Sequence, residues 1–159
     1  MQRRQVLVWG AGGLVLGWGR AQAHHGWSSF DDTRPIYLEG QAASVKWQNP
    51  HAELFLDVAP NLALPADLAK RTVPGQSASV DGTALLAKAS LPNRKDKRWE
   101  IELAPLTRMQ AWKVDEIKAG QKLAVLGYTF KEEKGSATLR VEYLWVDGKT
   151  YALRSSPLG

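Results

Sequence analysis

The chain has 159 residues, with 21 basic and 16 acidic side chains and a formal net charge of +5 at pH 7. It contains no cysteine, which excludes disulfides, thiolate metal ligands and thiol catalysis. Residues 1–23 hold three arginines and no acid, so residues 24–159 carry a net charge of only +2. A charge this small does not predict binding to nucleic acid or to a membrane surface.

Residues 1–23 have the features of an export signal. Arg3 and Arg4 precede an apolar run to about residue 18, and Ala21-Gln22-Ala23 has the small-x-small pattern of a signal-peptidase site. The run is shorter than the roughly 20 apolar residues that span a bilayer. The paired arginines resemble a twin-arginine signal, and an ordinary Sec signal is the alternative. We expect an exported protein, periplasmic or secreted, that begins at His24 and keeps no membrane anchor.

Residues 24–159 are expected to form one mainly β domain. The first extended run covers residues 36–47, and Gln48-Asn49-Pro50 then predicts a turn. The second run, residues 51–58, alternates apolar and polar side chains, as a half-buried strand does. The two runs therefore predict a hairpin.

The alternation stops between residues 59 and 97. Four prolines, together with alanines and serines, replace it, and large apolar residues are few. Such a segment cannot build a core of its own. We expect an irregular, partly mobile insertion rather than a second domain.

Regular patterns return at residue 98. Strands are predicted over residues 98–103, 121–130 and 138–146, with a short helix over residues 105–112 and a last short strand over residues 149–153. In the run 138–146, simple alternation places four side chains on one face: Leu139, Val141, Tyr143 and Trp145. Three strands, a helix and two strands predict a small OB-like five-stranded barrel with one short helix between strands 3 and 4. An open β-sandwich or a half-barrel with the helix as a lid is the alternative.

Three histidines suggest a metal site. His24, His25 and His51 are the only histidines of the chain. Cleavage after residue 23 would free the α-amine of His24, which forms a chelate with its own imidazole. A further imidazole from His51 or His25 would complete a three-nitrogen histidine brace, a donor set that suits Cu(II). Nearby carboxylates are expected to orient these ligands or supply an axial one: Asp31, Glu53 and Asp57.

Less specific interpretations apply to the same residues. Histidines near a chain start are often solvated, and the basic cluster at residues 94–98 is expected to be a solvated loop. An enzyme is disfavoured, because no acid–base pair or activated nucleophile is evident. Two hypotheses remain. The first is an exported copper-binding protein whose partner is the metal or an unidentified periplasmic protein. The second is a metal-free periplasmic binding module for a protein or small ligand.

Several segments resemble an uncharacterised family of small exported bacterial proteins. Its members typically begin the mature chain with His-His-Ser-Phe and carry Thr-Asn-Pro-His on an early strand. The corresponding segments here are His24-His25-Gly26-Trp27 and Gln48-Asn49-Pro50-His51. The family is a domain of unknown function, so the resemblance implies no activity. It implies only that the three histidines belong to the family's motif segments.

Overall fold

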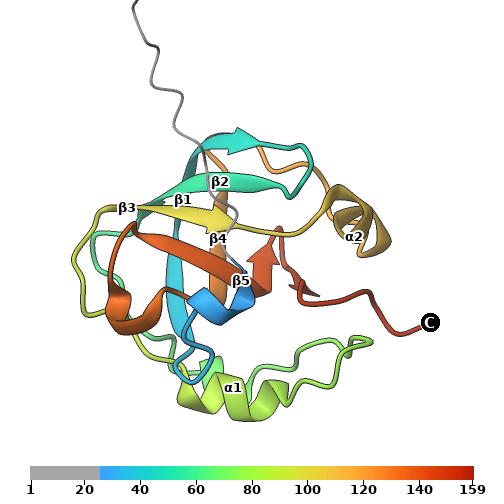
Figure 1. Cartoon of the computed structure of the whole chain (residues 1–159), viewed down its shortest axis with the longest axis horizontal. Coiled ribbons are helices and arrows are strands. Elements are labelled where there is room, and N and C mark those ends of the chain that lie inside the picture. The colour runs from blue at the N-terminus through green and yellow to red at the C-terminus, as the bar shows by residue number, and fades with distance from the viewer. Residues whose placement is uncertain (1–25) are drawn as a thin grey trace, which may run out of the picture.

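The structure, a computed structural model, describes residues 26–159 and consists mainly of a closed β-barrel with a few short helices (Figure 1). The strands are β1 (Ile36–Lys46), β2 (Glu53–Val58), β3 (Arg98–Glu102), β4 (Lys122–Tyr128), β5 (Thr138–Val146) and β6 (Lys149–Ala152). The α-helices are α1 (Gly82–Lys88) and α2 (Leu106–Ala111), and the short 3-10 helices are η1 (Trp27–Ser29), η2 (Leu68–Lys70) and η3 (Lys131–Glu133).

The barrel closes through one parallel strand pair. The sheet order is β3-β2-β1-β4-β5-β6, and neighbours in this order run antiparallel. An additional parallel pairing joins β3 to β5, with Ile101 opposite Leu139. Five strands therefore form a closed mixed barrel, while β6 extends β5 as a hairpin. The predicted OB-like barrel, with α2 between the third and fourth strands, is confirmed.

Apolar side chains from all five barrel strands fill the interior. They form one cluster in which most members are 0–2% exposed, among them Leu38, Leu54, Leu56, Trp99, Ile101, Val125 and Leu139. Met109 of α2 and Ile117 belong to the same cluster. The segment around α2 thus packs against the barrel core, and burial of this apolar surface is the main stabilising contribution to the fold.

The insertion at residues 59–97 forms a second layer outside the barrel. It contains η2 and α1, and α1 lies along one side of the barrel in Figure 1. Leu68 and Leu86 are buried there against Tyr37, Leu126 and Tyr143 of the sheet. The insertion therefore buries apolar residues without a core of its own, because the outer face of the sheet supplies the other half.

A β-bulge in β5 changes which side chains face the core. Leu126 pairs with Tyr143 and Gly127 pairs with Val141, which leaves Glu142 as the extra residue. Leu139 and Val141 face the interior before the bulge, whereas Leu144 and Val146 do so after it. Tyr143 and Trp145 belong to the outer cluster instead. The prediction that the four side chains share one face is therefore wrong for these last two.

The expected export signal and two of the three histidines lie outside the described residues. This applies to residues 1–23, His24 and His25. Within residues 26–159, no helix combines the length and the apolar character needed to cross a membrane.

Candidate functional site

His51 lies between the β1–β2 turn and the start of β2, where it meets the end of β3. Ala52 N donates to Ala104 O, and Leu103 N donates to Ala52 O, which joins the two segments. Nε2 of His51 is 3.8 Å from Oε1 of Glu102. The two side chains are only 17% and 10% exposed. The imidazole is thus held in a partly buried position beside a carboxylate.

Glu102 joins His51 to the barrel closure. It pairs with Arg140 in the parallel β3–β5 register, and Nε and Nη2 of Arg140 lie 2.9 and 2.8 Å from its Oε2. Burial disfavours the charged carboxylate, but the neighbouring His51 imidazole and the charge of Arg140 outweigh this effect and lower the pKa of Glu102. Glu102 therefore carries a negative charge at neutral pH, with one oxygen toward Arg140 and the other toward His51.

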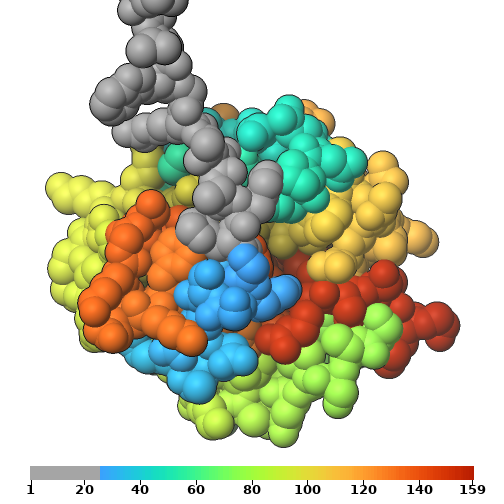
Figure 2. Space-filling view, viewed as in Figure 1, coloured from blue at the N-terminus to red at the C-terminus, as the bar shows by residue number. Residues whose placement is uncertain are grey.

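The start of the described chain packs directly over Arg140. The Cζ atom of Arg140 is 4.9 Å from the ring centre of Trp27 and 4.4 Å from that of Phe30, which is cation–π geometry. Phe30 also stacks on Phe130 at 4.8 Å, and Asp31 N donates to Thr129 O. Figure 2 shows this N-terminal segment between the residues around 130 and the C-terminal residues. The first described turn is thus fixed to the barrel.

These contacts form one continuous path from the N-terminal segment to His51. Trp27 contacts Arg140, Arg140 bonds to Glu102, and Glu102 faces His51. The histidine at the start of β2 therefore lies on the same side of the barrel as the point where the described chain begins.

The three predicted carboxylates lie in different places. Glu53 pairs with Lys46 at 2.9 Å and stands opposite Glu102 in the β2–β3 register, so it belongs to the surroundings of His51. Asp31 lies in the N-terminal segment, where it accepts a bond from Thr33 N. Asp57 lies four residues beyond Glu53, about 13 Å farther along β2, and it pairs with Arg98 at 2.6 Å. The structure therefore places Glu53 near His51, whereas Asp57 lies away from it.

The described donors near His51 do not form a complete metal site. Within residues 26–159, no group of three or more histidine, aspartate or glutamate side chains is arranged to hold a metal ion. His51 and Glu102 are the pair that the structure brings together.

A second buried acid belongs to an ion pair that also contacts Trp27. Glu142, the bulge residue, is fully buried, and it is 2.6 Å from Nη2 of Arg154 and accepts a bond of 2.9 Å from Nε2 of Gln76. Burial raises the pKa of Glu142, and the charge of Arg154 opposes that rise. The Cζ atom of Arg154 is 5.2 Å from the Trp27 ring. Trp27 thus rests on two guanidinium groups, each paired with a buried carboxylate.

Sequence reasoning missed Glu102, Arg140, Glu142 and Arg154. The alternation of β3 does place Glu102 on the face away from the barrel core, but nothing in the pattern puts it beside His51. That neighbourhood depends on the β2–β3 register and on the β3–β5 closure, which join segments far apart in the chain. The bulge that buries Glu142 has no signal in the alternation.

Comparison with known proteins finds one matching family, and the function of that family is unknown. Residues 13–65 match DUF6152, a family of unknown function. This range contains all three histidines and strands β1 and β2, and it ends before the insertion reaches α1. No curated protein and no solved structure matches the chain.

Proposed function

We propose that this chain is an exported copper-binding protein. Its Cu(II) ligands are the α-amine and imidazole of His24 and the imidazole of His51, with His25 as the alternative second imidazole. The observation that supports this proposal is the path of contacts from Trp27 through Arg140 and Glu102 to His51.

We infer that the N-terminal ligand can approach His51. His24 precedes Trp27 by three residues, and three residues of extended chain reach about 10 Å. Trp27 is anchored on Arg140, which also bonds to the carboxylate that faces His51. A fixed anchor this close to both ends of the proposed chelate lowers the entropy cost of bringing them together.

Glu102 would orient the His51 imidazole. A carboxylate near Nε2 favours the tautomer that carries its proton there, which leaves Nδ1 as the metal donor. Nitrogen donors without any thiolate favour Cu(II) over Cu(I), and a small set of them fits a tetragonal arrangement.

Export is part of the same proposal. The amine of His24 becomes a ligand only if the chain is cleaved after Ala23, and residues 1–23 have the pattern of a cleaved signal. The family match begins inside this segment and continues through His51. The protein would therefore acquire its metal site only after removal of its signal, in the periplasm or outside the cell.

The test compares two N-termini. One protein begins at His24, and the other retains Ala21-Gln22-Ala23 before it. Three extra residues are chosen because one or two would place a histidine third in the chain, where amine, backbone amides and imidazole form another tetragonal copper chelate. Intact mass of the exported protein establishes its first residue, and calorimetric titration with Cu(II) gives the affinities.

We expect the form beginning at His24 to bind one Cu(II) with a spectrum of nitrogen ligation. The extended form and a His51→Ala variant should each bind at least about tenfold more weakly, because each lacks one donor. Equal affinity of the two N-terminal forms would disprove the chelate. If the His51→Ala variant keeps its affinity for Cu(II) and the His25→Ala variant loses it, His25 supplies the second imidazole.

A metal-free binding module is the second candidate function. A cleft at the other end of β2 from His51 favours it. A double variant His24→Ala, His51→Ala that keeps its cellular function would support this candidate over copper binding.

A further inference from the structure

A cleft of about 680 Å³ opens at the end of β2 that is distant from His51. One wall is the chain that leaves β2, from Asp57 to Leu62, and the other is the loop at residues 91–97 that leads into β3. Pockets that hold small organic ligands have volumes of about 300–1,000 Å³. The cleft therefore has the size of a small-molecule site.

The inner surface of the cleft is apolar. Leu38 and Trp99 of the barrel line it, together with Leu62 and Leu91 from the two walls. Leu38 and Trp99 are 0% exposed, so they form a floor continuous with the barrel core. A ligand that fills this space must bring an apolar body, because a polar one would lose its hydration without gaining hydrogen bonds.

The rim of the cleft is basic. Its two acids are engaged, because Asp57 pairs with Arg98 and Asp96 pairs with Arg94. Lys95 and Lys97 also line the cleft and are exposed, and no ion pair is recorded for either within residues 26–159. Two ammonium groups at the rim of an apolar pocket favour an anionic ligand head.

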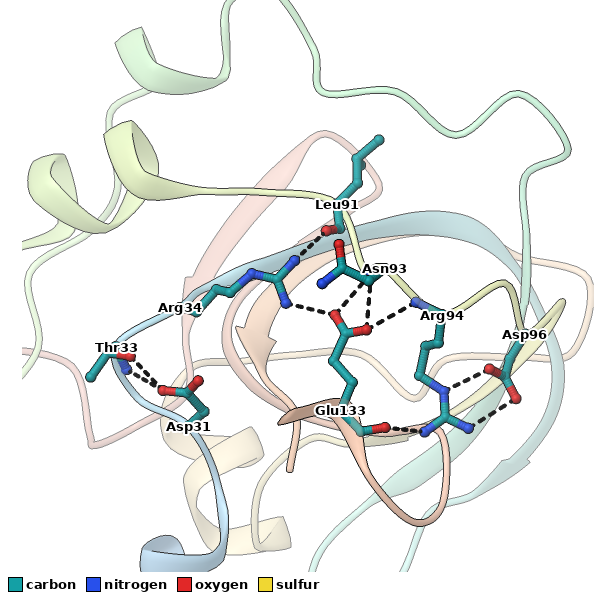
Figure 3. Close-up of polar contacts among 8 residues, drawn as sticks. All are labelled: Asp31, Thr33, Arg34, Leu91, Asn93, Arg94, Asp96 and Glu133. Atoms are coloured by element: carbon teal, nitrogen blue, oxygen red, sulfur yellow. Dashed lines mark hydrogen bonds and ion pairs between the residues drawn. The ribbon is translucent and has the colours of Figure 1, made fainter. Parts of the chain in front are cut away.

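The loop that carries these lysines is held rigidly although it has no regular secondary structure. Figure 3 shows the Glu133 carboxylate accepting bonds from the backbone N–H groups of Asn93 and Arg94 and from the Arg34 side chain. The Arg94 guanidinium in turn donates to the carbonyl oxygens of Glu133 and Gly135. A wall fixed in this way is preorganised, which reduces the entropy cost of binding.

The floor also contains an unused donor. Nε1 of Trp99 is buried and has no hydrogen-bond partner among the described residues. Buried donors are paired in the great majority of cases, so an exception calls for an explanation. Because Trp99 lines the cleft, the resonance of this N–H is expected to report a ligand that lies against the floor.

We propose that this cleft binds a small amphipathic organic anion, a carboxylate with an apolar chain or ring. The apolar body lies against Leu38, Leu62 and Trp99, and the carboxylate lies at the rim between Lys95 and Lys97. The site is separate from His51, since it lies at the opposite end of β2. It therefore adds a ligand class to the protein whether or not copper binds.

The test uses decanoate as the anion and decanol as its neutral counterpart. Both are titrated calorimetrically into the purified protein in the presence of a metal chelator. We expect decanoate to bind more tightly than decanol and to shift one indole N–H resonance in a proton–nitrogen spectrum. A His51→Ala variant should bind decanoate as the parent does, which separates this site from the copper proposal.

Variants at the rim identify the cleft as the site. Lys95→Gln with Lys97→Gln should weaken decanoate binding about tenfold or more, since a hydrogen bond to a charged group contributes at least that factor. The matched control is Lys118→Gln with Lys134→Gln, which removes two exposed lysines that do not line the cleft. Pro60→Glu, which adds a negative charge at an exposed lining position, should also weaken binding.

Three outcomes would overturn the proposal. They are absence of decanoate binding at concentrations of about 1 mM, equal binding of decanoate and decanol, and an equal effect of the rim and control lysine pairs. Thermal unfolding of each variant shows whether a loss of binding reflects a loss of fold.

Discussion

Nε2 of His51 lies 3.8 Å from Oε1 of Glu102, whose other oxygen is held by Arg140. One carboxylate thus connects the histidine at the start of β2 to the guanidinium on which Trp27 rests. The barrel closure between β3 and β5 creates this connection, because it places Glu102 opposite Arg140.

The first prediction concerns this carboxylate. Glu102→Gln should weaken Cu(II) binding by about 10- to 100-fold, the usual cost of losing a group that orients a metal ligand. Glu100→Gln is the matched control, because Glu100 is two residues earlier on the same face of β3. Calorimetric titration with Cu(II) measures both. Equal affinities for the two variants would remove Glu102 from the proposed site.

The second prediction concerns the bulge in β5. A Cβ atom added at Gly127 would lie 2.1 Å from the carbonyl oxygen of Arg140, which is a backbone atom and not the end of a flexible side chain. Gly127→Ala should therefore destabilise the fold by about 3 kcal/mol or more. Gly26→Ala is the control, because its added Cβ would meet nothing closer than Oγ of Ser28 at 3.9 Å. Urea unfolding measures the stability of both variants. Similar unfolding midpoints would contradict the close approach of Gly127 to the Arg140 backbone.

The third prediction is a pH dependence that arises from Glu133. Burial disfavours its charge, but the bonds from the Asn93 and Arg94 backbone and from Arg34 prevail and lower its pKa. Because the pKa of Glu133 is lower in the folded protein than in the unfolded chain, its charged form stabilises the fold. This stabilisation is complete above the pKa of the unfolded chain, about 4.3. It is lost as the pH falls through the pKa of the folded protein.

Glu133→Gln should therefore cost about 1–2 kcal/mol at pH 7 and progressively less as the pH falls below about 4. Urea unfolding of both proteins between pH 7 and pH 3 gives this difference. Amide exchange at Asn93 and Arg94 should also accelerate in the variant. A difference in stability that does not change with pH would show that the carboxylate charge is not what holds the loop.

The fourth prediction concerns the buried pair of Glu142 and Arg154. Arg154→Gln leaves the Glu142 carboxylate buried without its cation, which should cost about 3 kcal/mol or more at pH 7. Because the pKa of Glu142 is already raised, the folded variant takes up a proton more readily than the unfolded chain does. The loss should therefore shrink as the pH falls toward 5.

Unfolding of Arg154→Gln and the parent at pH 7 and pH 5 measures this effect. The double variant Arg154→Gln, Glu142→Gln is the control, because it has no carboxylate at position 142 to take up a proton and its deficit should not shrink as the pH falls. A single variant whose deficit stays constant would show that the carboxylate remains charged without its partner.

The sequence by itself determined the class of fold. The alternation at residues 51–58 and 98–103 and the short helix before residue 112 predicted the strands and helix that the structure contains, because alternation reports which face of a strand is buried. The order of these elements was sufficient to predict the OB-like barrel. The candidates His51 and Glu53 were named from local patterns alone, and the structure places them at the start of β2 after the Asn49-Pro50 turn.

Only the tertiary structure decided what surrounds His51 and which face Tyr143 and Trp145 occupy. Glu102 and Arg140 meet through strand pairings between distant segments, and a local pattern carries no information about register between such segments. The bulge at Glu142 shifts the alternation of β5 by one residue, which sends Tyr143 and Trp145 to the outer layer. Local periodicity thus determines which residues are buried within a strand, whereas long-range pairing determines which buried residues become neighbours.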